Sequence, residues 1–126
     1  MGFTQRWADG YKAAWEADDP DAAAALYAPD CLFRSAPFRD PEPPIAYTRR
    51  EYPKARAEDV RFGEPVEEGG RGTVEWWATL VTPAGEELAI AGCSVLRFDH
   101  QGLVVEARDY WHMEPGRREP HSTWGR

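Results

Sequence analysis

The second half of the chain carries four runs of alternating apolar and polar residues, a pattern that predicts β-strands. Three turn-forming segments separate these runs, at 67–72, 83–85 and 99–102. We therefore expect strands at about 60–66, 72–82, 87–99 and 103–112. Gly92, in the middle of the third of these strands, predicts a bend or bulge at that point.

The N-terminal part of the chain has the residue spacing of helices. Asp19 and Pro20 predict the start of a second helix, which continues through Tyr27 and ends before Pro29. A first helix is indicated by aromatic residues at every fourth position, which share one helical face: Phe3, Trp7, Tyr11 and Trp15.

Between the helices and the strands the pattern is weaker. Residues 31–35 predict a short strand, and the prolines in the segment 36–57 predict a loop that could cover a site beneath it. A third helix is expected at about 45–52, where Pro53 limits its length. The residues from 114 onward predict an irregular C-terminal tail.

Leading helices followed by long antiparallel strands predict an α+β fold. The expected strands are longer than the usual length of about five or six residues, so the sheet should coil strongly and wrap around the helices. A chain of 126 residues is expected to form one domain, here 1–113, followed by the tail at 114–126.

Composition and charge narrow the classes of function. A hydrophobic content of 42% predicts a packed core, and a net charge of −7 without basic clusters argues against a nucleic-acid partner. The chain has no apolar run of membrane-spanning length and no signal-peptide pattern, so we expect a cytoplasmic protein without membrane contact. The spacing of Cys31, Cys93 and three histidines does not suit a metal site; we expect free thiols, no metal and no cofactor.

One acidic residue in the last expected strand is unusual for its position. Asp109 shares an alternation face with three apolar residues, Val105, Ala107 and Trp111. Burying a carboxylate on such a face is unfavourable unless the group is paired or used in chemistry. Asp109 is therefore the best candidate for an acid or base. The alternative is a structural carboxylate, bonded to Tyr11 or to a backbone donor.

The order of elements resembles the nuclear transport factor 2-like superfamily, as do the segments Leu-Tyr-Ala-Pro-Asp at 26–30 and Leu-Arg-Phe-Asp-His-Gln-Gly at 96–102. The resemblance covers about residues 3–113. It implies a conical half-barrel, in which a curved antiparallel sheet and the N-terminal helices enclose an apolar pocket. The superfamily includes ketosteroid isomerases, limonene epoxide hydrolases and SnoaL-like polyketide cyclases, so the site has to decide the function.

Resemblance to the ketosteroid isomerases places Tyr11 at their substrate-binding tyrosine and Tyr27 at a second tyrosine that supports it. Their general base would fall at Ser35 and their protonated aspartic acid at Ser94, so this resemblance implies that Tyr27, Ser35 and Ser94 contribute to ligand binding. A serine alone cannot abstract a proton beside a carbonyl, which argues against steroid isomerisation by that mechanism.

Resemblance to the other two groups centres on Asp109. It matches an aspartate of the limonene epoxide hydrolases, but their further Arg and Asp are replaced by Trp76 and Ala78, which argues against that activity. SnoaL-like cyclases need only one acidic residue at this place. Resemblance to them implies Asp109 as acid or base with a raised pKa, Tyr11 as hydrogen-bond donor, and an apolar pocket lined by Trp15, Phe33, Trp76, Ile90, Ala107 and Trp111.

Two hypotheses stay open. One is an acid–base isomerase, cyclase or hydrolase that acts on a hydrophobic, carbonyl-bearing or cyclic molecule. The other is a non-catalytic dimeric module that binds a small hydrophobic ligand or a partner chain. Trp77 should point away from Trp76, so we expect a homodimer through the convex face of the sheet. Three arginines could offer a charge to an acidic ligand, but we expect them to be solvated on the surface: Arg34, Arg39 and Arg108.

Overall fold

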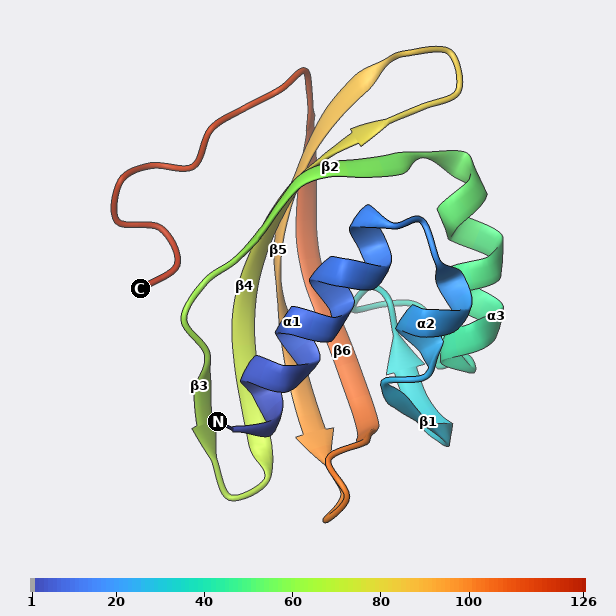
Figure 1. Ribbon diagram of the computed structural model, residues 1–126, viewed down its shortest axis with the longest axis vertical. Helices are drawn as coiled ribbons and strands as arrows, with labels where there is room; N and C mark the ends of the chain where they lie inside the picture. Colours follow the sequence, from blue (N-terminus) through green and yellow to red (C-terminus); the bar gives the residue numbers. More distant parts are fainter. Residues whose placement is uncertain (1) are drawn as a thin grey trace.

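The computed structural model describes residues 2–126 as an α+β structure in which one curved, unclosed sheet wraps around the N-terminal helices (Figure 1). The sheet order is β1-β6-β5-β4-β2, with the short β3 paired to β4. β1 runs parallel to β6, and the other neighbours are antiparallel. The strands are β1 (Tyr27–Arg34), β2 (Arg56–Phe62), β3 (Val66–Glu68), β4 (Arg71–Val81), β5 (Glu87–Phe98) and β6 (Val104–Pro115). The expected fold class is confirmed.

The first helix, α1 (Phe3–Glu16), packs against the concave side of the sheet through its aromatic face. Trp7 is buried in the main core, and its ring centroid lies 5.2 Å from that of Tyr11. Trp15 follows at 5.7 Å from Tyr11. The predicted aromatic face therefore forms part of the core at one end and leads towards the interior of the half-barrel at the other.

The second helix is shorter than the sequence predicts. α2 (Pro20–Ala24) is capped by Asp19, whose Oδ1 accepts a backbone hydrogen bond at 3.0 Å. The helix does not continue through Tyr27, which instead starts β1. Tyr27 is buried, and its ring centroid lies 6.5 Å from that of Trp7 and 5.8 Å from that of Phe33. This packing outweighs the helix propensity of the alanine run, which is a weak preference.

The proline-rich segment is partly helical. After a loop at 35–43, the chain forms α3 (Pro44–Glu51), which continues into one 3-10 turn, η1 (Tyr52–Lys54). α3 matches the expected third helix. It packs beside α2, where the Thr48 hydroxyl donates to the carbonyl of Pro20 at 3.0 Å. α3 and η1 therefore close one side of the space under the sheet (Figure 1).

The first expected strand, at 60–66, is wrong in its position. β2 begins earlier and ends before that range does, and β3 is a separate short strand. Asp59 has a φ of 51°, at a point where the pairing of β2 with β4 shifts register. A bulge of this kind changes which residues face the core, so a regular alternation read from the sequence slips along the strand.

A second register shift changes the predicted face of Val105. It lies near the start of β6, where Val104 pairs with Phe98. Val104 is fully buried in the core, whereas Val105 is only half-buried. Beyond the shift the predicted alternation holds, and three residues face the concave side: Ala107, Asp109 and Trp111.

Gly92 does not mark a bulge, because β5 pairs continuously there, with Trp76 on one side and Trp111 on the other. A Cβ atom at this position would lie 2.5 Å from the backbone oxygen of Tyr110, 2.7 Å from the Trp76 ring and 2.8 Å from the Cβ of Trp111. Glycine is therefore needed here because its neighbours leave no room for a side chain.

The C-terminal tail begins at 116 rather than at 114, because β6 continues to Pro115. It has no helix or strand but returns along the sheet beside β2 and β4 (Figure 1). The rings of Trp124 and Trp77 pack edge to face with centroids 5.9 Å apart, and Trp77 Nε1 donates to a tail carbonyl at 2.8 Å. Arg117 forms ion pairs with Glu58 at 2.7 Å and Glu87 at 2.6 Å. Trp77 thus points away from the pocket, as predicted, and is covered by the chain's own tail.

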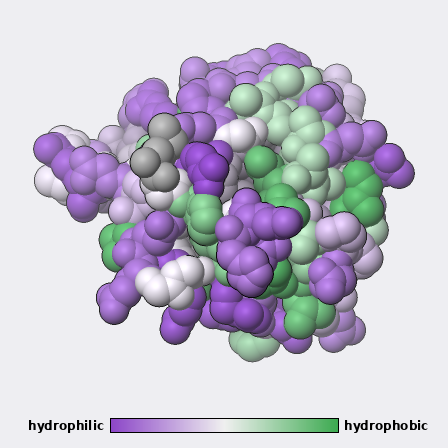
Figure 2. All heavy atoms as spheres, turned by 60° about the horizontal axis from the view of Figure 1, so that its bottom comes forward, coloured by the Kyte–Doolittle hydropathy of each residue, from purple (hydrophilic) through white to green (hydrophobic). Residues whose placement is uncertain are grey.

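The surface seen in Figure 2 is mainly hydrophilic, with hydrophobic side chains gathered in small areas. Within residues 2–126, no helix is long and apolar enough to cross a membrane. Cys31 is buried and Cys93 is half-buried, and both are free thiols.

Candidate functional site

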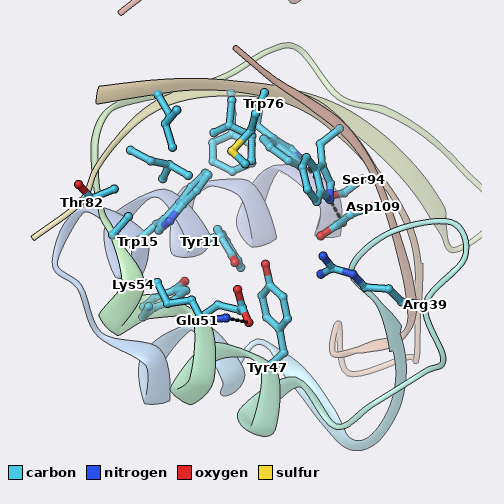
Figure 3. Close-up of a pocket in the computed structure, with 18 of the residues that line it drawn as sticks. Tyr11, Trp15, Arg39, Tyr47, Glu51, Lys54, Trp76, Thr82, Ser94 and Asp109 are labelled. Carbon is cyan, nitrogen blue, oxygen red and sulfur yellow. Dashed lines mark hydrogen bonds and ion pairs between the residues drawn. The ribbon is translucent and has the colours of Figure 1, made fainter. Parts of the chain in front are cut away.

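A pocket of about 350 Å³ lies between the concave side of the sheet and the helices (Figure 3). Its size is near the lower end of the range of about 300–1,000 Å³ that is typical of small-molecule sites. One end is apolar, with Leu80, Leu88 and Ile90. The other end brings Asp109 and Arg39 into the same space. The pocket thus joins an apolar volume to a small polar end, which is the usual arrangement of a ligand site.

Asp109 faces this pocket from β6, directly opposite Ser94 of β5. The Ser94 hydroxyl donates to Asp109 Oδ1 at 2.6 Å, and Trp76 Nε1 donates to Ser94 Oγ at 2.9 Å. Because an indole N–H can only donate, Ser94 accepts from Trp76 and has its own proton free for Asp109. Asp109 Oδ2 has no hydrogen-bond partner among residues 2–126. The carboxyl group is therefore oriented through one oxygen, and its other oxygen is left for a ligand.

Burial raises the pKa of Asp109 to about 7, and the hydrogen bond from Ser94 opposes part of that rise. The direction is the one expected from a carboxylate on an apolar face. A carboxyl group with this pKa is present in both protonation states near neutral pH, so it can give or accept a proton. Tyr11 forms no hydrogen bond to Asp109. The structural alternative, a carboxylate anchored by Tyr11 or by the backbone, does not describe this group.

The tyrosines of the pocket differ in their relation to Asp109. Tyr11 lines the pocket, and burial raises its pKa well above the ordinary value, so its hydroxyl stays protonated. Burial also raises the pKa of Tyr27 and Tyr47, and the negative charge of Asp109 adds to the rise in both cases. That charge is not among the causes for Tyr11. The charge of Asp109 therefore acts on Tyr27 and Tyr47, and Figure 3 shows Tyr47 pointing into the same pocket as Asp109.

Most of the lining residues that the sequence predicts do reach the pocket: Trp15, Tyr27, Trp76, Ile90, Ser94 and Trp111. Three do not. Phe33 and Ala107 are buried in the main core, where the Phe33 ring packs against Tyr27 and Tyr47 with centroids 5.8 and 4.8 Å away. Ser35 is buried at the end of β1; its Oγ accepts from Arg39 at 2.8 Å, and its carbonyl accepts from Trp111 Nε1 at 2.6 Å. Ser35 therefore supports the pocket wall from behind.

The residues that the sequence analysis missed come mainly from the proline-rich segment. Arg39 is exposed, as expected, but its side chain also lines the pocket, and so do four residues of α3 and η1: Tyr47, Glu51, Tyr52 and Lys54. One signal was available, because Tyr47 and Glu51 are four residues apart and share one helical face. Within residues 2–126, no group of His, Cys, Asp or Glu is arranged to hold a metal ion.

A family model for the SnoaL-like domain matches residues 7–107, which is most of the chain. The match includes Ser94 and ends two residues before Asp109. A search of the curated proteins found no match.

Solved structures are similar to this chain in fold. RV0760c from Mycobacterium tuberculosis has a TM-score of 0.76 at 16% identity, covering 92% of this chain and 98% of its own. Delta 5-3-ketosteroid isomerase from Mycobacterium sp. has a TM-score of 0.73 at 16% identity, covering 90% and 98%. An epoxide hydrolase from Mycobacterium tuberculosis, similar to limonene epoxide hydrolases, has a TM-score of 0.69 at 19% identity, covering 85% and 80%. At these identities the similarity shows the fold alone.

Proposed function

The chain belongs to the SnoaL-like domain family of the nuclear transport factor 2-like superfamily, and we propose that it is an enzyme that uses Asp109 as its acid or base. The reaction is of the isomerase, cyclase or hydrolase type, and the substrate is a hydrophobic molecule with a carbonyl group or a ring. The proposal rests on the hydrogen bonding and the pKa of Asp109. One oxygen is held by Ser94, the other is unbonded within residues 2–126, and the pKa is about 7.

The geometry supports proton transfer at Asp109 Oδ2. Ser94 orients the carboxyl group through Oδ1, so the unbonded oxygen is the one that meets the substrate. In its ionised form the group would take a proton from a carbon beside a carbonyl, and in its protonated form it would give one to a carbonyl or epoxide oxygen. The protonated hydroxyls of Tyr11 and Tyr47 supply donors for an oxygen that gains negative charge in the transition state.

The isomerase and epoxide hydrolase of similar fold support this class of reaction but not their particular mechanisms. Ser35, at the place of the ketosteroid isomerase base, does not line the pocket. Ala78, which replaces a charged residue of the limonene epoxide hydrolases, is fully buried. In this chain Asp109 therefore has to serve alone as the acid–base group.

A non-catalytic binding module is the second candidate, and the scarcity of free charged groups in the pocket favours it. The other carboxylate of the pocket, Glu51, forms ion pairs with Lys54 at 3.0 Å and with Arg50 at 2.8 Å. Only one acidic group is thus left for chemistry, and an apolar pocket with one polar end could also hold a ligand without changing it.

A screen of epoxides and of unsaturated ketones, followed by one substitution, tests the proposal. Asp109→Asn keeps the shape of the side chain and should lower turnover of any substrate found by about 10²–10⁴-fold, the usual contribution of a general acid or base. Asp40→Asn, at an exposed carboxylate outside the pocket, is the matched control and should leave turnover unchanged. Undiminished turnover in Asp109→Asn would refute the assignment. Ligand binding without turnover of any compound would support the binding module.

A further inference from the structure

The polar end of the pocket holds an arginine, Arg39, that is also exposed to solvent, as expected from the sequence. Arg39 follows β1 and points its guanidinium into the pocket, at the end that holds Asp109 and Tyr47 (Figure 3). Its Nη1 donates to Ser35 Oγ at 2.8 Å, and its Cζ lies 5.8 Å from the centroid of the Trp111 ring. This distance is within the range of about 6 Å for a cation–π contact. Arg39 is therefore held in place from two sides.

Arg39 forms no ion pair within residues 2–126, although carboxylates lie near it. Both oxygens of Glu42 accept hydrogen bonds from Arg50, at 2.7 and 2.9 Å. These bonds are the main reason for the lowered pKa of Glu42, and the charge of Arg39 adds only a small part. The other cation of the pocket, Lys54, is paired with Glu51 at 3.0 Å. A guanidinium has five N–H donors, and only one of those of Arg39 is used by the protein. The remaining donors are available to a bound molecule.

We propose that the pocket takes a cyclic or aromatic molecule that carries a carboxylate, and that Arg39 binds this carboxylate. The inference rests on the proposed function, since it assigns a substrate class to the same pocket. A guanidinium suits a planar carboxylate because two of its N–H groups can bind both oxygens. The ring system would lie beside Trp15 and Trp76, which line the pocket and pack against each other edge to face with centroids 5.9 Å apart.

The nearby carboxyl group of Asp109 does not prevent this binding. The groups that face Asp109 are Ser94, Arg39, and the hydroxyls of Tyr27 and Tyr47, and both tyrosines stay neutral near pH 7. The pKa of Asp109 is about 7, so a second negative charge nearby would shift it to its protonated form. The bound carboxylate would then lie next to the positive guanidinium of Arg39 and the neutral, protonated carboxyl group of Asp109. Its affinity should fall as the pH rises above 7.

Calorimetric titration with two probes of the same shape tests the proposal: 2-naphthoic acid, which is ionised, and 2-naphthamide, which is neutral. The wild-type protein should bind the acid about ten- to a hundredfold more tightly than the amide, the range expected for hydrogen bonds to a charged group. Arg39→Gln should abolish this preference and leave the affinity for the amide unchanged, which also shows that the pocket is intact. Arg34→Gln is the control, because Arg34 is half-buried on β1 and does not line the pocket.

Three results would overturn the inference: equal affinity for the two probes in the wild-type protein, a preference that persists in Arg39→Gln, or no binding of either probe. The result is separate from that of the proposed function. An Arg39-dependent preference without any Asp109-dependent turnover would refute the catalytic proposal alone. Asp109-dependent turnover of neutral substrates, without a preference for the acid, would refute the substrate class alone.

Discussion

The pKa of Asp109 predicts that this residue makes the fold less stable at high pH than at low pH. In the folded protein the pKa is about 7, against an ordinary value of 3.8. The folded state therefore holds a proton on Asp109 between about pH 4 and pH 7, where the unfolded chain has lost it. Stability contributed by this group is fully present below pH 4 and is lost as the pH rises to 7, after which the loss is constant.

The magnitude follows from the difference between the two pKa values. Each pKa unit corresponds to about 1.4 kcal/mol, so a difference of about 3 gives an upper value of about 4 kcal/mol. Asp109 is partly accessible from the pocket, and water there screens part of its charge. We therefore expect a loss of about 2–4 kcal/mol in the wild-type protein between pH 4 and pH 8 from this residue.

Asp109→Asn isolates this contribution because Asn has the same shape but does not titrate. Ser94 can still donate to the side-chain oxygen of Asn, so the hydrogen bond is kept. Urea unfolding of both proteins at pH 4, 6 and 8 gives the difference in their free energies of unfolding. The variant should gain about 2–4 kcal/mol relative to the wild type between pH 4 and pH 8. The reasoning would be refuted if the difference in free energy of unfolding between the two proteins did not change with pH, or if Asp109→Asn were less stable than the wild type at pH 8. Asp40→Asn, at an exposed site, should change stability by less than about 0.5 kcal/mol at every pH.

Four further predictions concern the surroundings of the pocket and the outer face of the sheet. Ser94→Ala should raise the pKa of Asp109 further, because the carboxyl group loses the hydrogen bond from Ser94, and NMR titration with an unchanged pKa would contradict this. The same change should lower stability by about 1–3 kcal/mol in urea unfolding, because the Trp76 indole N–H loses its acceptor. Gly92→Ala should lower stability by about 1–3 kcal/mol, since its methyl group would meet the backbone oxygen of Tyr110 and both tryptophans; thermal unfolding with no loss would contradict this. Trp124→Ala should lower stability by about 1–2 kcal/mol without changing ligand affinity, because it removes only the contact of the tail with Trp77. Light scattering should show a homodimer, formed on the part of the convex face that the tail leaves open; a monomer at micromolar concentration would contradict this prediction.

The secondary structure was predictable wherever a regular period continued over several turns or strand residues. The spacing of Phe3, Trp7, Tyr11 and Trp15 located α1, and the turn segments located β4, β5 and β6. The prediction failed where a tertiary contact or a bulge interrupted the period. Tyr27 left the second helix because its ring is buried against other aromatic residues, and Val104 took the core position expected for Val105.

The sequence by itself determined that Asp109 shares a face with Ala107 and Trp111, because the alternation between these residues is not interrupted by a bulge. It also determined that a row of aromatic residues on α1 would meet the concave side of the sheet. Only the tertiary structure decided which of these side chains reach the pocket. Phe33 and Ala107 lie on the same side of the sheet as the pocket, but they are buried in the main core, where Tyr27 and Tyr47 pack against Phe33. Arg39 and Tyr47 come to Asp109 from a proline-rich segment about 60–70 residues earlier in the chain, which has no long period of its own. The pKa of Asp109 was decided in the same way, since desolvation depends on every element that surrounds a group in space, not on its neighbours in sequence.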